Sequence, residues 1–196
     1  NRKPGRRREG EADDAGALIE TALSELGQLD VLVNNAGITR DTLMMRMSED
    51  DWDAVVGVNL KTAFFLAQAV ARAMVAGGRG GKIINIVSML SFQGGVRVAS
   101  YTASKSGLLG LTRLLANEWA AKGINVNAIA PGYFVTNNTE ALRSDATRNR
   151  AILDRIPAGR WGVPAELGGA AVFLASAAAD YVHGAVLPVD GGWLAR

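Results

Sequence analysis

Four short apolar segments, separated by helical patterns, constrain the fold of this chain more than any other feature of its sequence. The segments are 29–33, 82–87, 124–130 and 185–189, and turn-forming or polar residues bound each of them. Continuous apolar runs of this length are typical of strands covered on both faces of a parallel sheet. Strands that alternate with helices build right-handed βαβ units. The sequence therefore predicts one α/β domain around a mostly parallel, four-stranded sheet.

Helical periodicity fills the segments between these strands. A helix over Ala15–Leu26 is expected to end at Gly27, and Pro164 is expected to open a helix near the C-terminus. Ser48 is expected to be the N-cap of a long helix that continues to about Ala76. Residues 1–14 contain almost no apolar side chain. They are predicted to be a disordered or non-native tail, which leaves 15–196 as the folded domain.

Composition narrows the classes of function. The chain has no cysteine, which excludes disulfides, thiolate catalysis and cysteine-ligated zinc, and a cytoplasmic location is expected. The net charge is only +2 and the basic residues cluster only at 6–8, so no nucleic-acid partner is expected. No run of about 18 apolar residues occurs, so no membrane partner is expected. His183 stands alone in the sequence, and no metal site is expected around it.

Polar and small residues follow three of the predicted strands. They are 34–37 after the first strand, Ser88 after the second and 131–136 after the third. Tyr101 and Lys105 lie four residues apart at the start of the helix that follows Ser88. A tyrosine and a lysine at this spacing often share a helix face by coincidence, but coincidence would not gather polar residues at three strand ends. Because ligands of open parallel sheets bind beyond the carboxyl ends of the strands, a ligand site is predicted there.

Ser88, Tyr101 and Lys105 form a coherent acid/base group. A free phenol has a pKa near 10, and the ammonium of Lys105 is expected to lower the pKa of Tyr101. Ser88 can donate a hydrogen bond to a substrate oxygen that faces the phenol. Such a group suits proton transfer to or from a carbonyl or alcohol oxygen, and the hydride must then come from a cofactor. Asn59 is the fourth candidate: it either faces solvent or helps to hold a water beside Lys105.

The ordered set "NNAG", Asn59, Ser88, "YTASK" and "PG" resembles the short-chain dehydrogenase/reductase family, and the resemblance extends from about Ala12 to Arg196. It implies a Rossmann-like, doubly wound parallel sheet that binds NAD or NADP, with NAD favoured. It also implies that Asn59, Ser88, Tyr101 and Lys105 are the catalytic residues. The implied cofactor contacts are Asn35, Ala36, Gly37, Tyr101, Lys105, Pro131, Gly132, Phe134 and Thr136.

Different parts of the sequence resemble two branches of this family. Residues 37–61 resemble 3-oxoacyl-acyl-carrier-protein reductases. From Lys82 onwards the chain resembles sugar-acid dehydrogenases of the 2-dehydro-3-deoxy-D-gluconate 5-dehydrogenase and 2-deoxy-D-gluconate 3-dehydrogenase types. The loops that read the substrate in this family belong to the second type, so a small polyhydroxy acid is implied. Arg97 is a candidate partner for a carboxylate. For the four loop residues, a position that merely faces solvent is an equally simple interpretation. The expected substrate contacts are Ser88, Gln93, Arg97, Asn137 and Asn138.

The glycine-rich turn that binds a dinucleotide pyrophosphate in this family does not occur in the sequence. The "GGRGG" stretch at 77–81 precedes a strand instead of following one, so it does not have the context of such a turn. The chain is therefore expected to lack the first βα units of the fold, to bind NADH poorly by itself and to expose apolar strand edges. Two classes stay open: the catalytic portion of a homo-oligomeric oxidoreductase, dimer or tetramer, acting on a small molecule, and a non-catalytic assembly partner.

Overall fold

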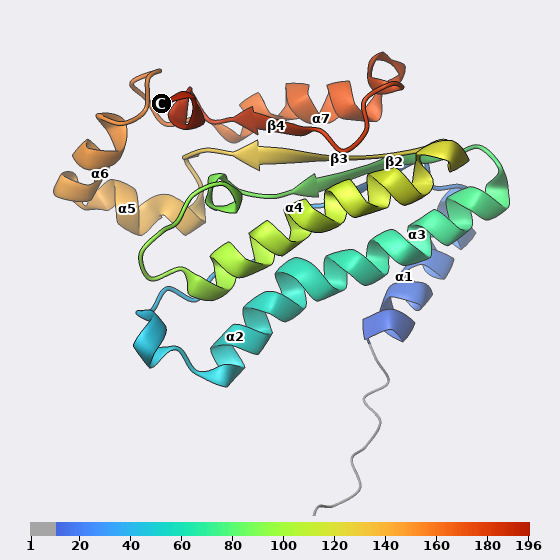
Figure 1. The fold of residues 1–196 in the computed structure, drawn as a ribbon, viewed down its shortest axis with the longest axis horizontal. Helices are drawn as coiled ribbons and strands as arrows, with labels where there is room; N and C mark the ends of the chain where they lie inside the picture. Colours follow the sequence, from blue (N-terminus) through green and yellow to red (C-terminus); the bar gives the residue numbers. More distant parts are fainter. Residues whose placement is uncertain (1–10) are drawn as a thin grey trace, which may run out of the picture.

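The computed structural model describes residues 11–196 and places a parallel sheet between two layers of helices (Figure 1). The sheet has the spatial order β1-β2-β3-β4, and each neighbouring pair is parallel. The predicted parallel sheet of four strands is therefore confirmed, with end points that move by one or two residues. The strands are β1 (Val31–Asn34), β2 (Gly81–Ile86), β3 (Ile124–Pro131) and β4 (Val186–Val189).

Helices cover both faces of this sheet, as a doubly wound fold requires. On one face, α1, α3 and α4 pack over a core that includes Ile83 and Val126. On the opposite face, α7 packs on Ile84 and Ile129 through Leu174. The helices are α1 (Glu11–Leu26), α2 (Glu49–Val56), α3 (Ala63–Gly77), α4 (Ala99–Trp119), α5 (Glu140–Ser144), α6 (Ala146–Leu153) and α7 (Gly168–Ala175).

The first helix begins earlier than the sequence pattern indicates. α1 begins at Glu11, four residues before the predicted start at Ala15. The prediction relied on apolar periodicity, and residues 11–14 contain almost no apolar side chain. The predicted tail therefore overlaps a helix at residues 11–14, and its first ten residues lie outside the part of the chain that the structure describes.

The edge strand β1 is covered on one face only, so the prediction of a strand buried on both faces is wrong here. Leu32 packs against the core beneath α1 and α3. Val31 and Val33 point to the other face and are 40% and 46% exposed. Within the described residues, β1 pairs with β2 alone. The exposed apolar side chains that the sequence led us to expect at a strand edge therefore lie on β1.

One long helix, interrupted by a π-helical turn, crosses the domain in front of the sheet. α2 continues through a π-helical turn over Gly57–Thr62 into α3. Ser48 is the N-cap, as predicted, and its Oγ accepts a hydrogen bond from the Asp51 amide at 3.1 Å. The 29 residues of Glu49–Gly77 are apolar enough to cross a membrane by length and composition. Of the most apolar stretch of 18 residues in this segment, 33% is buried, and the buried side chains there, such as Val70, belong to the core of the domain.

Candidate active site

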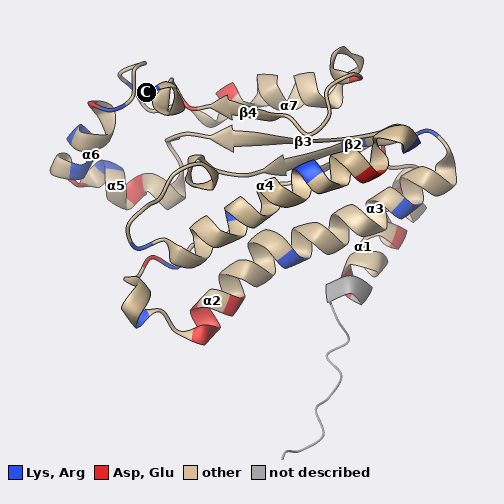
Figure 2. Cartoon of the chain, in the orientation of Figure 1, with Lys and Arg blue, Asp and Glu red and all other residues tan. Residues whose placement is uncertain are grey.

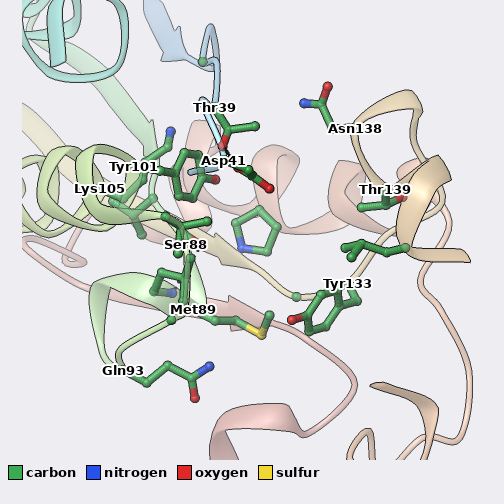
Figure 3. Close-up of a pocket in the computed structure, with 18 of the residues that line it drawn as sticks. Thr39, Asp41, Ser88, Met89, Gln93, Tyr101, Lys105, Tyr133, Asn138 and Thr139 are labelled. Carbon is green, nitrogen blue, oxygen red and sulfur yellow. Dashed lines mark hydrogen bonds between the residues drawn. The ribbon is translucent and has the colours of Figure 1, made fainter. Parts of the chain in front are cut away.

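A cleft of about 530 Å³ lies beyond the carboxyl ends of β1, β2 and β3, where the sequence predicts a ligand site. The loops after these strands, the start of α4, and α5 and α6 supply its walls. Figure 3 shows side chains from these segments facing one another across the cleft. A volume of this size suits a small organic ligand.

Ser88 and Tyr101 meet inside the cleft. Ser88 is buried directly after β2, and its Oγ accepts a hydrogen bond from the Leu90 amide at 3.2 Å, which holds the side chain in place. Tyr101 lies in the first turn of α4, and its hydroxyl is close enough to the side chain of Ser88 for this contact to lower its pKa in part. The two hydroxyl groups therefore lie together at the edge of the sheet, and both line the cleft (Figure 3).

The pKa of Tyr101 differs from the expectation. Burial raises this pKa above the ordinary value of 10.0, the contact with Ser88 lowers it in part, and the carboxylate of Asp41 raises it further. The prediction that Lys105 lowers the pKa of Tyr101 is wrong for this structure. The Nζ of Lys105 lies 5.8 Å from the centroid of the tyrosine ring, and burial, which disfavours the charged phenolate, is the largest cause of the shift. The phenol is therefore protonated near neutral pH.

Lys105 is a buried cation with one hydrogen bond to the main chain. It is 3% exposed, and its Nζ donates a hydrogen bond of 2.6 Å to the carbonyl oxygen of Ile86. Burial lowers its pKa from 10.5 to about 8. The Nζ of Lys105 also lies beside Gly37, since a Cβ at Gly37 would stand 3.5 Å from it. Lys105 therefore joins the end of β2 to the loop that follows β1.

Asn59 faces the interior, so the solvent-facing interpretation is wrong. The side chain is 1% exposed and lies in the π-helical turn. Its Oδ1 accepts a hydrogen bond from the Ile38 amide at 2.8 Å, and its Nδ2 donates to the Ile38 carbonyl at 2.9 Å. A third bond of 3.2 Å joins Nδ2 to Ser104 Oγ. Asn59 therefore fastens the loop after β1 to α4, at the residue that precedes Lys105.

Most of the predicted cofactor contacts lie in this cleft, and three do not. Ala36, Phe134 and Thr136 lie outside its lining. Phe134 is buried against Gly162, where a Cβ would approach its ring to 2.6 Å. The Thr136 amide donates a hydrogen bond to Thr139 Oγ1 at 3.1 Å. The residues that do line the cleft are Asn35, Gly37, Tyr101, Lys105, Pro131 and Gly132.

Some of the predicted substrate contacts line the cleft, and others lie outside it. Ser88, Gln93 and Asn138 line the cleft, whereas Arg97 and Asn137 do not. Arg97 is exposed with a φ of 72°, and its carbonyl accepts a hydrogen bond from the Thr42 amide. It therefore braces the loop through its main chain. The cleft residues with polar side chains that sequence reasoning missed are Thr39, Asp41, Thr139 and Arg148.

Some of these missed residues carried a signal in the sequence. Thr39 and Asp41 lie in the loop after β1, so the rule that located Ser88 could also have found them. Arg148 lies on α6, far along the chain from any strand end, and only the folded structure brings it to the cleft.

Comparisons with known proteins agree with this geometry. A family model described as Enoyl-(Acyl carrier protein) reductase matches residues 10–194. The 2-dehydro-3-deoxy-D-gluconate 5-dehydrogenase of Dickeya dadantii (strain 3937) is 63% identical over 180 residues, which cover 92% of this chain and 71% of that protein. The 3-oxoacyl-[acyl-carrier-protein] reductase of Thermotoga maritima is 44% identical over 92% of this chain and 72% of that protein.

A solved structure shares both the fold and much of the sequence. It is the crystal structure of a gluconate 5-dehydrogenase from Burkholderia cenocepacia J2315 in complex with NADP and tartrate. The TM-score is 0.90 at 46% sequence identity, over 93% of this chain and 71% of that one. With the family match and the doubly wound sheet, these similarities establish the family: this chain belongs to the short-chain dehydrogenase/reductases.

Proposed function

We propose that the protein carrying this chain is an NAD(P)-dependent oxidoreductase that interconverts a secondary alcohol and a ketone on a small sugar acid of the keto-deoxygluconate type. The observation that carries the proposal is the contact between the Ser88 and Tyr101 side chains in a cleft beyond the sheet. A protonated phenol beside a second hydroxyl group is a donor set that suits the oxygen of a carbonyl group.

The proton chemistry follows from the pKa directions. Because the pKa of Tyr101 is raised, its hydroxyl carries a proton that it can donate to the oxygen of a bound ketone. Ser88 donates a second hydrogen bond to the same oxygen and so keeps it facing the phenol. In the direction of oxidation, Tyr101 must first lose its own proton to solvent, and the phenolate then receives the proton that the alcohol releases. Asn59 acts in this proposal by holding the loop after β1 against α4.

The residues present fit one end of a nicotinamide cofactor. A lysine ammonium has three donors, and among the described residues Lys105 uses one of them, on the Ile86 carbonyl. The remaining donors would hold hydroxyl groups of the cofactor, next to the turn at Pro131 and Gly132. NAD(P), when bound there, would supply or accept the hydride. The sequence contains no glycine-rich turn for the pyrophosphate, so the described residues fit the nicotinamide end only.

The substrate class rests on the relatives and on the loops around the cleft. The relative at 63% identity is a sugar-acid dehydrogenase, and the acyl-carrier-protein reductase is 44% identical. Gln93 and Asn138 line the cleft, and amide groups suit the hydroxyl groups of a sugar acid. Reduction of a 3-oxoacyl thioester is the second candidate, and the resemblance of residues 37–61 to such reductases favours it.

One experiment separates these functions. The protein would be assayed at its natural length with NAD and with NADP, on 2-dehydro-3-deoxy-D-gluconate and on a 3-oxoacyl thioester. We expect turnover of the sugar acid. Turnover of the thioester alone would favour the second candidate, and turnover of neither would favour the non-catalytic assembly partner.

Homo-oligomeric assembly and a cytoplasmic location remain predictions. Light scattering on the purified protein would measure the oligomeric state, for which we expect a dimer or a tetramer.

A further inference from the structure

Charged side chains lie at both ends of the cleft. Those that line it are Asp41, Lys105 and Arg148. Lys105 is buried on the Ile86 carbonyl, so Asp41 and Arg148 are the exposed pair. The carboxylate of Asp41 is close enough to Tyr101 to raise the pKa of the phenol. The reacting end therefore carries the exposed carboxylate of Asp41 together with the buried ammonium of Lys105.

Arg148 lies at the other wall, beside Tyr133. Burial raises the pKa of Tyr133, and the guanidinium groups of Arg155 and Arg148 lower it in part. Figure 3 shows Tyr133 across the cleft from Tyr101 and Asp41. The side chain of Asp145 caps α6 by accepting a hydrogen bond of 3.0 Å from the Arg148 amide, which fixes the main chain at Arg148.

Arg148 differs from the neighbouring arginines in having no partner for its guanidinium among the described residues. Figure 2 shows basic residues on α6, and the segment around this helix is rich in arginine. The neighbours bind acceptors on the protein: Arg143 on the Thr136 carbonyl, Arg150 on Asp154, Arg155 on Gln93 and Arg160 on Glu166. Arg148 is thus the guanidinium at the cleft that is available to a ligand.

We propose that Arg148 binds the carboxylate of the sugar-acid substrate and so sets the direction in which the substrate lies in the cleft. This proposal rests on the proposed function and deepens it. A guanidinium pairs with a carboxylate through two parallel hydrogen bonds, a geometry that few other side chains provide. The exposed carboxylate of Asp41 at the reacting end can accept hydrogen bonds from the hydroxyl groups of the substrate. The acid end is therefore directed towards α6, and the hydroxyl-bearing end towards Tyr101.

This role replaces the one that the sequence suggested for Arg97. Arg97 lies outside the cleft. Arg155 already has partners on the protein, because its guanidinium donates to Gln93 at 3.0 Å and stacks on the Trp193 ring at 4.0 Å. Arg148 is the arginine that combines a place in the cleft lining with a free guanidinium in residues 11–196.

The test compares an acid with its neutral ester in the protein at its natural length. The substrates are 2-dehydro-3-deoxy-D-gluconate and its methyl ester, and the variants are Arg148→Gln, Arg148→Lys and Arg150→Gln. We expect Arg148→Gln to raise the KM for the acid roughly ten- to hundredfold, as for the loss of a charge-assisted hydrogen bond, with little change in kcat. KM for the ester should hardly change. Arg148→Lys should restore part of the affinity for the acid.

Arg150→Gln is the matched control, because Arg150 lies on the same helix but pairs with Asp154 outside the cleft. It should leave both substrates unaffected, and thermal unfolding should show that all variants fold. An unchanged KM for the acid in Arg148→Gln would overturn the proposal while the proposed function stands. An equal rise in KM for acid and ester would also overturn it, since a structural role would then explain both. A wild-type protein that turns over neither compound would remove the proposed function, and this proposal with it.

Discussion

The Nζ of Lys105 is 2.6 Å from the carbonyl oxygen of Ile86, the last residue of β2. This hydrogen bond ties the ammonium to the strand end that leads directly to Ser88. Lys105 is therefore part of the framework of the cleft, and its charge does not lower the pKa of Tyr101. Because burial lowers the pKa of Lys105 to about 8, its own charge is the one that changes near neutral pH.

The stability of the protein should depend on pH through Lys105. Its pKa is about 8 in the folded state and 10.5 in the unfolded chain, so between these values the unfolded state binds more protons. The free energy of unfolding should therefore rise with pH in this window, by at most about 1.4 kcal/mol per pH unit from this group. Lys105→Met should remove the rise. Urea unfolding of both proteins from pH 7.5 to 9.5 measures it, and parallel curves would contradict the prediction.

Tyr101→Phe should stop turnover and leave cofactor affinity nearly intact. The substitution removes the hydroxyl that donates the proton, and general acid catalysis typically contributes a factor of about 10² to 10⁴ to the rate. Single-turnover kinetics and fluorescence titration with NADH or NADPH measure the two quantities. Tyr181→Phe is the control, since Tyr181 is fully exposed. Retained turnover in Tyr101→Phe would assign the proton transfer to another group.

Asn59→Ala should destabilise the fold. The side chain satisfies both the amide and the carbonyl group of Ile38, which lose their partner in the variant. Leaving such groups unpaired costs about 1–3 kcal/mol, which denaturant unfolding detects. Asn117→Ala serves for comparison, because Asn117 is exposed on α4 and bonds only the carbonyl of Arg113 among the described residues. Equal losses of stability in the two variants would show that Asn59 does not brace the loop.

Gly132→Ala should disrupt the turn after β3. A Cβ at this position would approach Asp190 Cα to 2.5 Å, so the main chain would have to move. We expect a loss of about 1–3 kcal/mol in the free energy of unfolding, together with reduced activity, because Gly132 lines the cleft. Gly110→Ala should instead stabilise the protein by about 0.5–1 kcal/mol, since Gly110 lies inside α4 with open space around it. A Gly132→Ala protein as stable as the wild type would contradict the close approach.

The strands and the first residues of the long helix could be predicted because their signals are local. An apolar run between turn residues specifies a buried strand such as β3, and Ser48 before three acidic residues specifies an N-cap. The position of Ser88 at a strand end was equally readable, since parallel strands bring their carboxyl ends to one edge. The contact between Ser88 and Tyr101 agrees with that reasoning.

Features that depend on contacts between distant segments could not be predicted from local sequence signals. The π-helical turn around Asn59 coincides with contacts to Ile38 and Ser104, from two other parts of the chain. The direction of the pKa shift of Tyr101 was wrong because desolvation depends on what covers the phenol, and spacing along a helix cannot give that. Arg148 reaches the cleft only through the long excursion between β3 and β4.

The π-helical turn over Gly57–Thr62 also limits how the length of this segment can change. A π turn holds one residue more than an α-helical turn, so it offsets the angular phase of α2 and α3 by about 100°. Deleting one residue here would restore regular winding, but it would rotate one half of the helix against the other. Either Val55 or Asn59 would then turn out of the interior, where both are now fully buried. The number of residues at this point is thus as strongly constrained as the identity of any side chain in the core.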